Sequence, residues 1–350
     1  MNGVYLDWAA TSPIVRFSID TNKQWRNPNA AYAYEERKVL LDCEERIKAA
    51  IGAKGGKVVF GGTSSQLVEN LFTHIYDETN EYLTICSVYE HDSIWRFADQ
   101  WGNIDSLKHA IQTYHGDKQL IICLMGVNNL TGGIFPVVDI GNACHQHNAF
   151  YICDMTAMIG KAPIPPNIDQ WCDCAVWSGH KLGTELGIGA MWISDRLDKW
   201  LNGFKLHGTP NLAGALALTQ AVEGACDISS IEDKNVQWMD LSDELYSGLI
   251  DICDTMAQVG NNEGCWAINA IRLPGINADA LQQYLATKQI YIGVGHSSCA
   301  EDANYRVLKA YGLTEQEASE VIMVSFGPES SIDDVRALVD GIKEYREKFC

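Results

Sequence analysis

Lys181 is the residue that most directly suggests chemistry in this sequence. The apolar run 174–177 reads as a short buried strand, and Ser178-Gly179 then permits a sharp turn before His180 and Lys181. A lysine amine that is partly removed from water loses its proton more readily and becomes a nucleophile. Its commonest use is a Schiff base with a carbonyl cofactor such as pyridoxal 5'-phosphate. A surface lysine in a turn is the alternative reading of Lys181 alone.

Polar residues follow three further apolar runs in the same way. Runs 83–88, 120–125 and 150–153 read as strands, and they lead into His91, Asn129 and Asp154 respectively. Asp154 could pair with a pyridine nitrogen, His91 could stack on the ring and handle protons, and Asn129 could hydrogen-bond a ring oxygen. Each of them alone could equally be a cap, a turn residue or a satisfied core group. Four consecutive cases favour a ligand site.

The elements that position these residues alternate between strand and helix. Helical patterns such as 140–147 separate the strand-like runs, which predicts βαβ units and a mainly parallel sheet of the α/β class. In an open sheet of this kind, ligands bind beyond the carboxyl ends of the strands. The predicted topology therefore gathers the polar residues at one edge.

A loop of glycine, serine and threonine, 61–66, joins strand 58–60 to the apolar helix 67–75. Such a loop presents backbone N–H groups and hydroxyls to an anion at a helix N-terminus. It has neither the lysine of a P-loop nor the GxGxxG of a dinucleotide site. We expect Thr63, Ser64 and Ser65, together with Ser178 and His180, to hold one phosphate. A simple helix cap is the alternative.

The C-terminal part of the chain predicts a smaller α+β unit. Strands are expected at 265–273, 290–293 and 321–326, and helices at 278–287 and 332–348. A polar loop there ends in Cys299, whose thiolate a nearby cation would stabilise; an incidental cysteine is the alternative. We assign residues 14–240 to a large cofactor-binding domain, and residues 1–13 with 241–350 to a small domain that carries the Cys299 loop.

The composition of the chain limits the kinds of binding partner and the cellular compartment that we expect. The net charge of −19, from 45 acidic and 26 basic residues, argues against nucleic acid or anionic membrane as the main partner. No apolar run reaches the roughly 20 residues of a membrane span, and the start lacks a signal peptide. The twelve cysteines are scattered and fit free thiols in a reducing cytoplasm. The one close pair, Cys172 and Cys174, has no metal spacing, so no metal site is expected.

Taken in order, these motifs resemble the cysteine desulfurase family, within the class V aminotransferase group of fold-type I pyridoxal-phosphate enzymes. The resemblance covers nearly the whole chain. The matching segments are 5–11 (like YLDNAAT), 27–28 (NPS), 90–91 (EH), 127–132 (VNNETG), Asp154, 178–181 (S-[AG]-H-K), 208–211 (GTPN) and 296–299, where the family has GSAC.

The resemblance implies a fold, a cofactor and a reaction. It implies a homodimer whose large domain has a seven-stranded, mainly parallel sheet between helices, with pyridoxal 5'-phosphate bound to Lys181. Thr209 would reach the phosphate in the partner subunit. Cys299 would take the sulfur of L-cysteine as a persulfide, with release of alanine, and a sulfur-acceptor protein is a possible further partner.

The sequence departs from this family where the substrate would bind. Met323 stands where the family has a carboxylate-binding arginine, Pro328 replaces the next arginine, and the arginine before the GTPN segment is missing. Ala157 replaces a glutamine near the cofactor, and Gln66 replaces a glutamate. Two alternatives therefore stay open. One is a lyase, transaminase or epimerase that uses the same cofactor on another amino-acid-like substrate, and the other is a non-catalytic homologue.

Overall fold

The computed structural model describes residues 3–15, 17, 23–78, 81–260, 265–296 and 305–350. The chain forms two compact units. The larger comprises residues 14–127 and 135–231, and the smaller comprises 1–13, 128–134 and 232–350. The segment 128–134, which the sequence assigns to the large domain, thus groups with both chain ends.

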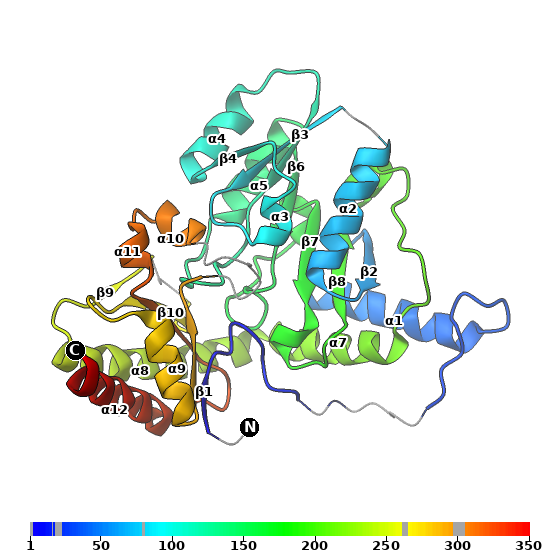
Figure 1. Cartoon of the computed structure of the whole chain (residues 1–350). Helices are drawn as coiled ribbons and strands as arrows, with labels where there is room; N and C mark the ends of the chain where they lie inside the picture. The colour runs from blue at the N-terminus through cyan, green and yellow to red at the C-terminus, as the bar shows by residue number, and fades with distance from the viewer. Residues whose placement is uncertain (1–2, 16, 18–22, 79–80, 261–264, 297–304) are drawn as a thin grey trace. The chain divides into compact units, whose positions relative to one another are not determined.

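The larger unit is built on a seven-stranded mixed sheet (Figure 1). Four of the six neighbouring pairs are parallel, and only β8 runs against its two neighbours. In spatial order the strands are β2 (Lys57–Gly61), β8 (Gly189–Ile193), β7 (Cys174–Ser178), β6 (Phe150–Asp154), β5 (Gln119–Cys123), β3 (Tyr82–Ser87) and β4 (Gln100–Gly102).

Helices connect these strands, as the alternating pattern predicts. The helices of this unit are α1 (Tyr34–Ala50), α2 (Ser64–Glu78), α3 (Asp92–Trp95), α4 (Ile104–Thr113), α5 (Val137–Gln146), α6 (Asp195–Trp200) and α7 (Leu212–Ala225), with short 3-10 turns η1 (Ile168–Gln170) and η2 (Gly179–Leu182). Leu67, Leu71 and Ile75 recur at helical spacing on α2 and pack against Ile152 and Val176 of the sheet. This buried face fixes the start of α2 beside the strands.

The smaller unit contains a five-stranded sheet in the order β1 (Val4–Leu6), β11 (Ile290–Val294), β12 (Val321–Ser325), β10 (Ile268–Arg272) and β9 (Ala257–Gln258). β1 pairs in parallel with β11, and the other pairs are antiparallel. The remaining helices are α8 (Ile228–Ile252), which starts in the larger unit, α9 (Ala278–Thr287), α10 (Arg306–Ala310), α11 (Glu315–Ala318) and α12 (Ile332–Phe349).

The structure confirms the predicted fold class and most of the predicted elements. β6 and β7 each extend one residue beyond the predicted runs 150–153 and 174–177, and α9 has the predicted bounds. β4, α4 and β8 were not anticipated. Within the described ranges, no helix is long and apolar enough to cross a membrane.

Candidate active site

The carboxyl ends of β6 and β7 carry two of the predicted site residues side by side. Asp154 ends β6 and is 6% exposed, while Ser178 ends β7 and is 3% exposed. Because Asp154 lies opposite Val176 in the parallel register, Ser178 is two residues further along the neighbouring strand. The Thr156 N–H donates to Asp154 Oδ1 at 2.8 Å, and the described residues provide no other hydrogen bond to this carboxylate.

Lys181 lies in the short turn η2 that directly follows β7. Gly179 opens this turn, and a Cβ added there would lie 2.4 Å from Thr184 Oγ1, which is too close for a side chain. Gly183 ends the turn with a φ of 82°, a backbone conformation that favours glycine. His180 is half-buried beside Lys181. Burial, together with the Lys181 ammonium, lowers the pKa of His180 below its usual range. The His180 imidazole is therefore neutral at pH 7.

The predicted phosphate loop is joined directly to the lysine turn. Ser64 begins the 15-residue helix α2, and Thr63 caps it by accepting the Gln66 N–H at 3.0 Å. The Ser64 N–H donates to Ser178 Oγ at 3.0 Å, and the two hydroxyl oxygens lie 2.8 Å apart. Gly189 makes room for this approach, because a Cβ there would lie 3.0 Å from the Ser64 nitrogen. The Ser178 side chain thus accepts the first backbone N–H of α2.

His91 is held at the end of β3 by its own helix cap and by Glu90. Its Nδ1 accepts the Ser93 N–H at 3.2 Å, so the neutral ring carries its proton on Nε2. Glu90, which is fully buried, accepts the Ser87 hydroxyl and the Met125 N–H, each at 2.7 Å. This carboxylate ties the end of β3 to the chain just beyond β5. Sequence reasoning named Glu90 only as part of a motif, although an acid between apolar runs was the available signal.

Thr209 lines a cavity of about 500 Å³ in the larger unit. Gly62 and Gln66, from the phosphate loop of the same chain, line this cavity too, as do Lys205 and Asn211. The Gly62 N–H donates to Gln66 Oε1 at 2.8 Å. Gln66, which replaces the family glutamate, therefore forms a hydrogen bond within its own loop. The structure therefore brings the 208–211 segment and the phosphate loop to one cavity.

Two further predicted site residues do not belong to the described part of the larger unit. Asn129 belongs to the smaller unit, in a turn built on the Asn128 side chain, whose Oδ1 accepts the Thr131 N–H at 2.9 Å. Cys299 lies outside the described residues.

Comparisons with known proteins identify the family of the chain. Residues 4–338 match the family described as aminotransferase class-V. The chain belongs to this family. The cysteine desulfurase IscS of Methanosarcina thermophila is 25% identical over 388 residues, which cover 99% of this chain and 92% of that protein.

Solved structures identify the fold of the chain. The NifS-like protein from Rickettsia africae ESF-5 matches with a TM-score of 0.82 at 20% identity, over 99% of this chain and 100% of that one. The cysteine desulfurase CsdA from Escherichia coli matches with a TM-score of 0.76 at 18% identity, over 99% and 96% of the two chains. At these identities the likeness establishes the fold.

The residues of this class V aminotransferase fit the pyridoxal phosphate that its family uses. Ser64 and Ser178 bring two hydroxyls together at a helix N-terminus, which suits a phosphate. Asp154 is a buried carboxylate with a single donor, which suits a protonated ring nitrogen. Thr156 Oγ1 is buried and has no hydrogen-bond partner among the described residues. The donors and acceptors thus match a ligand that has a phosphate and a basic ring nitrogen.

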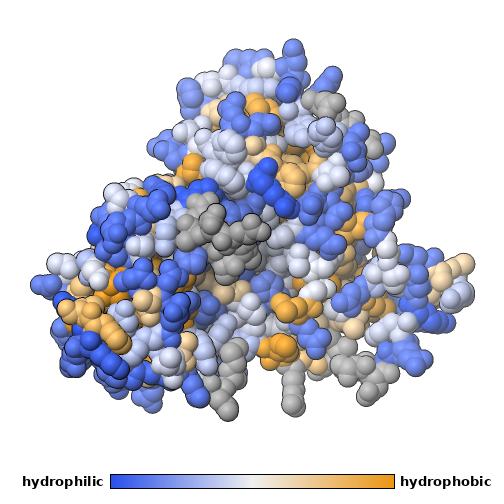
Figure 2. All heavy atoms as spheres, in the orientation of Figure 1, coloured by the Kyte–Doolittle hydropathy of each residue, from blue (hydrophilic) through white to orange (hydrophobic). Residues whose placement is uncertain are grey.

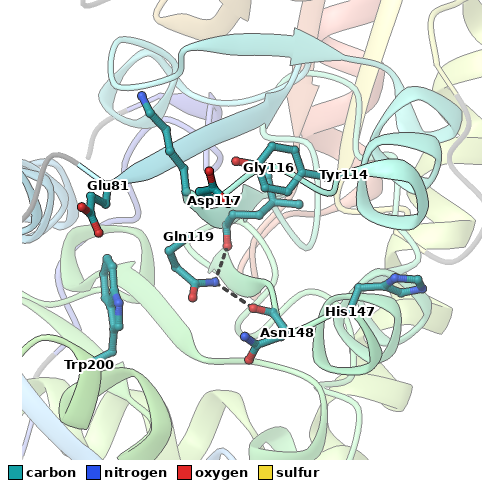
Figure 3. Close-up of a pocket in the computed structure, with 10 residues that line it drawn as sticks. Glu81, Tyr114, Gly116, Asp117, Gln119, His147, Asn148 and Trp200 are labelled. Atoms are coloured by element: carbon teal, nitrogen blue, oxygen red, sulfur yellow. Dashed lines mark hydrogen bonds between the residues drawn. The ribbon is translucent and has the colours of Figure 1, made fainter.

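A second pocket of this unit, of about 370 Å³, lies at the opposite end of the strands (Figure 3). Its lining includes Glu81, Gln119 and Asn148, which stand at or just before the amino ends of β3, β5 and β6. Gln119 Nε2 bridges to the Asn148 carbonyl oxygen at 2.8 Å. None of the predicted site residues lines this pocket.

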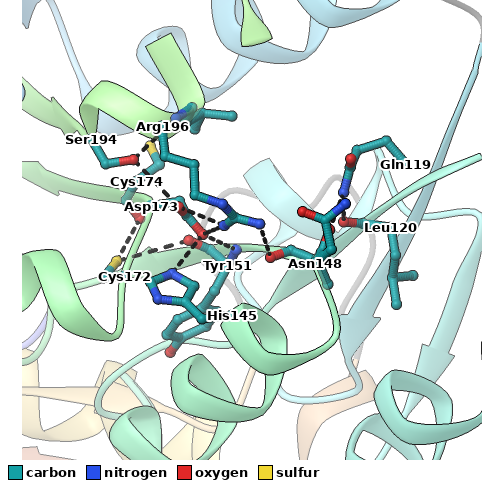
Figure 4. A network of polar contacts seen from close by, with 12 residues as sticks. Gln119, Leu120, His145, Asn148, Tyr151, Cys172, Asp173, Cys174, Ser194 and Arg196 are labelled. Atoms are coloured by element: carbon teal, nitrogen blue, oxygen red, sulfur yellow. Dashed lines mark hydrogen bonds and ion pairs between the residues drawn. The ribbon is translucent and has the colours of Figure 1, made fainter. Parts of the chain in front are cut away.

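Asp173 anchors a buried polar network near that same end (Figure 4). Its carboxylate accepts hydrogen bonds from the Tyr151 N–H at 3.0 Å and from Arg196 Nη1 at 2.8 Å, and His145 Nε2 lies 3.1 Å from it. Ser194 Oγ adds a contact at 3.3 Å. Every acceptor position of Asp173 is engaged by protein donors, so we assign it a structural role.

Proposed function

We propose that this class V aminotransferase is a pyridoxal-phosphate-dependent cysteine desulfurase. In the proposed reaction the C–S bond of L-cysteine breaks, the sulfur forms an S–S bond with Cys299, and L-alanine leaves. Cysteine and the Cys299 thiol together supply all atoms of alanine and the persulfide. The observation that carries the proposal is the meeting of the lysine turn, the Ser64 helix start and the buried Asp154 carboxylate at the carboxyl ends of β6 and β7.

Pyridoxal phosphate, when bound, supplies an electron sink that stabilises charge at the substrate carbon. Around it, Lys181 would hold the cofactor and move a proton at Nζ, and His91 would move one at Nε2. Asp154 would keep the ring nitrogen protonated, and Asn129 would bond the ring oxygen. The phosphate would be bound by the cradle hydroxyls and the neighbouring imidazole, which come from Thr63, Ser64, Ser65, Ser178 and His180. Thr209 would reach the phosphate bound in the partner subunit.

Two substitutions test this assignment separately. Lys181→Ala should abolish the visible absorbance of bound cofactor and the release of alanine. Cys299→Ser should leave that absorbance intact and abolish sulfide release from cysteine. Retained absorbance in the first variant, or unchanged sulfide release in the second, would refute the corresponding role.

We also infer a homodimer that acts in the cytoplasm. Large apolar side chains on the larger unit are exposed, among them Ile14 (67%), Leu41 (60%) and Leu186 (77%), and such groups favour burial against another chain. The cysteines of the described ranges are free thiols, as expected in a reducing compartment. Light scattering should give twice the 38.7 kDa chain mass, and Leu186→Glu should shift it toward the monomer. A monomeric wild-type protein would contradict the dimer.

One observation favours a second candidate, in which the substrate lacks a free carboxylate. A Cβ added at Gly293 would lie 2.9 Å from Asp7 Oδ1 and 3.1 Å from Met323 Cβ, so a carboxylate stands beside Met323. In the resemblance, position 323 carries the arginine that binds the substrate carboxylate. A negative charge there repels a second carboxylate. The reaction would then be that of a lyase, transaminase or epimerase on a carboxyl-blocked amine.

Comparing L-cysteine with L-cysteinamide discriminates between the two candidates. A cysteine desulfurase should release sulfide from cysteine at least as fast as from the amide. The second candidate predicts faster turnover of the amide, and predicts that Met323→Arg restores the preference for cysteine. Purified protein that binds no cofactor would instead indicate a non-catalytic homologue.

A further inference from the structure

Glu90 is a carboxylate held wholly inside the larger unit, directly before His91 in the chain. The surface in the view of Figure 2 is mostly hydrophilic, with apolar side chains in small groups, and carboxylates ordinarily lie at such a surface. Glu90 is instead 0% exposed. Burying a carboxylate costs solvation free energy unless protein donors bind it, so its contacts indicate what the burial achieves.

The Glu90 carboxylate joins two neighbouring strands just beyond their carboxyl ends. Its Oε1 accepts the hydroxyl of Ser87, the last residue of β3, at 2.7 Å. The same oxygen accepts the N–H of Met125, which lies two residues beyond the end of β5, at 2.7 Å. Both contacts are short, as is typical of hydrogen bonds to a carboxylate oxygen. The residue before His91 is thus bound to the backbone that continues the adjacent strand.

The chain beyond β5 also holds the end of β6. The Gly126 N–H donates to the Asp154 carbonyl oxygen at 2.9 Å. In the sheet, β5 lies between β3 and β6, so residues 125 and 126 bridge the strands on either side of it. The path from His91 to Asp154 thus runs through the Glu90 carboxylate and then through backbone groups of Met125 and Gly126.

The backbone on both sides of His91 is anchored. Before it, the Tyr89 ring stacks on Phe135, with ring centroids 5.2 Å apart and an interplanar angle of 27°. The Phe135 N–H in turn donates to the Gly126 carbonyl oxygen at 3.0 Å. After it, His91 caps α3, whose Ile94 is fully buried in the core. A change in the contacts of the preceding carboxylate is therefore expected to move His91.

The spacing of His91 and Asp154 matters because both are assigned to the same ring. The function proposed above places His91 on the ring and Asp154 at its nitrogen. A misplacement of about 1 Å in such a site can lower a rate by about 10²-fold. Side chains of a site reach this precision when neighbouring hydrogen bonds lock them. Glu90 provides such a bond beside His91, through the Met125 N–H.

We propose that Glu90 is a positioning residue that sets the His91 imidazole relative to Asp154, so that both can contact one cofactor ring. The inference rests on the function proposed above, which assigns these two residues to pyridoxal phosphate. Glu90 itself touches neither substrate nor cofactor in this role and acts through His91.

Glu90→Gln in the full-length protein, loaded with pyridoxal phosphate, tests the role. A carboxamide oxygen is a weaker acceptor than a carboxylate, so the contacts to Ser87 and Met125 should loosen. The visible circular dichroism of the bound cofactor reports how its ring is oriented, and this band should fall at least about twofold. The rate constant kcat for alanine release should fall roughly tenfold, with KM within about twofold of wild type. An unchanged dichroism band would overturn the proposal.

A double-mutant cycle tests whether Glu90 acts through His91. Adding Glu90→Gln to His91→Ala should change kcat by less than about twofold, because the imidazole that the carboxylate positions is already gone. Full additivity of the two losses would overturn the proposal and leave the proposed function intact. The same cycle on the dichroism band uses no turnover. A protein that binds cofactor but releases no sulfide would therefore refute the proposed function while still testing Glu90.

Asp173→Asn is the matched control, since it alters a second buried carboxylate of the same unit, whose partners lie at the opposite end of the strands. It should leave the dichroism band of the folded protein unchanged. Equal losses of the band in the Asp173 and Glu90 variants would reduce Glu90 to a contributor to stability and would overturn its positioning role. If Glu90→Gln fails to fold, Ser87→Ala removes one donor and keeps the Met125 contact, and it should weaken the band by a smaller factor. No change in that variant would likewise contradict the proposal.

Discussion

Asp154 and Asp173 lie at opposite ends of two adjacent strands, and both are buried. Asp154 ends β6 and is 6% exposed, and Asp173 immediately precedes β7 and is 1% exposed. Asp173 is engaged by His145, Arg196, Ser194 and the Tyr151 N–H, whereas the described residues give Asp154 the Thr156 N–H alone. Burial does not separate a structural carboxylate from a functional one. The number of protein donors does, because a carboxylate with acceptor positions to spare can bind a ligand.

The largest expected effect is on activity, at Asp154. Asp154→Asn should lower kcat/KM for alanine release from cysteine by about 10³-fold, since a buried charge-assisted contact contributes roughly 2–5 kcal/mol. The melting temperature should stay within about 2 °C, because only one protein hydrogen bond depends on the carboxylate. If Asp154→Asn kept activity within tenfold of wild type, Asp154 would not differ from Asp173 in its importance for catalysis.

The next effect is on stability, at Asp173. Asp173→Asn should lower the free energy of unfolding by about 3 kcal/mol, because it leaves the buried donors of Arg196 and Tyr151 poorly paired. Urea denaturation measures this, and Asp243→Asn on α8 should change it by less than about 0.5 kcal/mol. The folded fraction should keep its activity, and a catalytic defect without loss of stability would contradict the structural assignment.

A smaller effect is expected at the link between the lysine turn and α2. Ser178→Ala removes the hydroxyl that accepts the Ser64 N–H and should weaken cofactor binding roughly tenfold, or about 1.4 kcal/mol. Equilibrium dialysis against pyridoxal phosphate measures the change. Ser65→Ala, one residue into α2, should cost less, because Ser65 makes no side-chain hydrogen bond in the described structure. Equal losses in both variants would show that the Ser178 contact has no special part in the cradle.

The smallest effect concerns His180 and pH. Because the folded protein holds the pKa of His180 below its usual value, the unfolded chain binds more protons as the pH falls below about 6.5. Stability of the protein without added cofactor should therefore decline as the pH falls through that range. His180→Gln should flatten this decline in urea titrations between pH 7 and 5. An unchanged slope would show that the imidazole is not held neutral.

The same two regions show how far the sequence alone can lead. The strand ends at Asp154 and Ser178 were predictable, because local hydrophobic runs and the residues that follow them carry the signal. Asp173 was not assigned a role, because its partners, His145 and Arg196, lie 28 and 23 residues away in the chain and only the fold unites them. β8 was missed because its run 189–193 follows a glycine-rich segment, and its antiparallel direction depends on β2 and β7. The approach of Asp7 and Met323 to the same side of Gly293 depends on the fold in the same way.

The pairing of Val4 with Ile290 has a consequence for the order in which the protein is made. Val4 of β1 is synthesised 286 residues before Ile290, its partner on β11. The fully buried side chain of Leu6 must therefore stay exposed, or be covered by something else, until β11 has been made. The larger unit ends at residue 231, so all of its residues are synthesised while the smaller unit is still incomplete. The first strand of the chain is thus among the last to find its place.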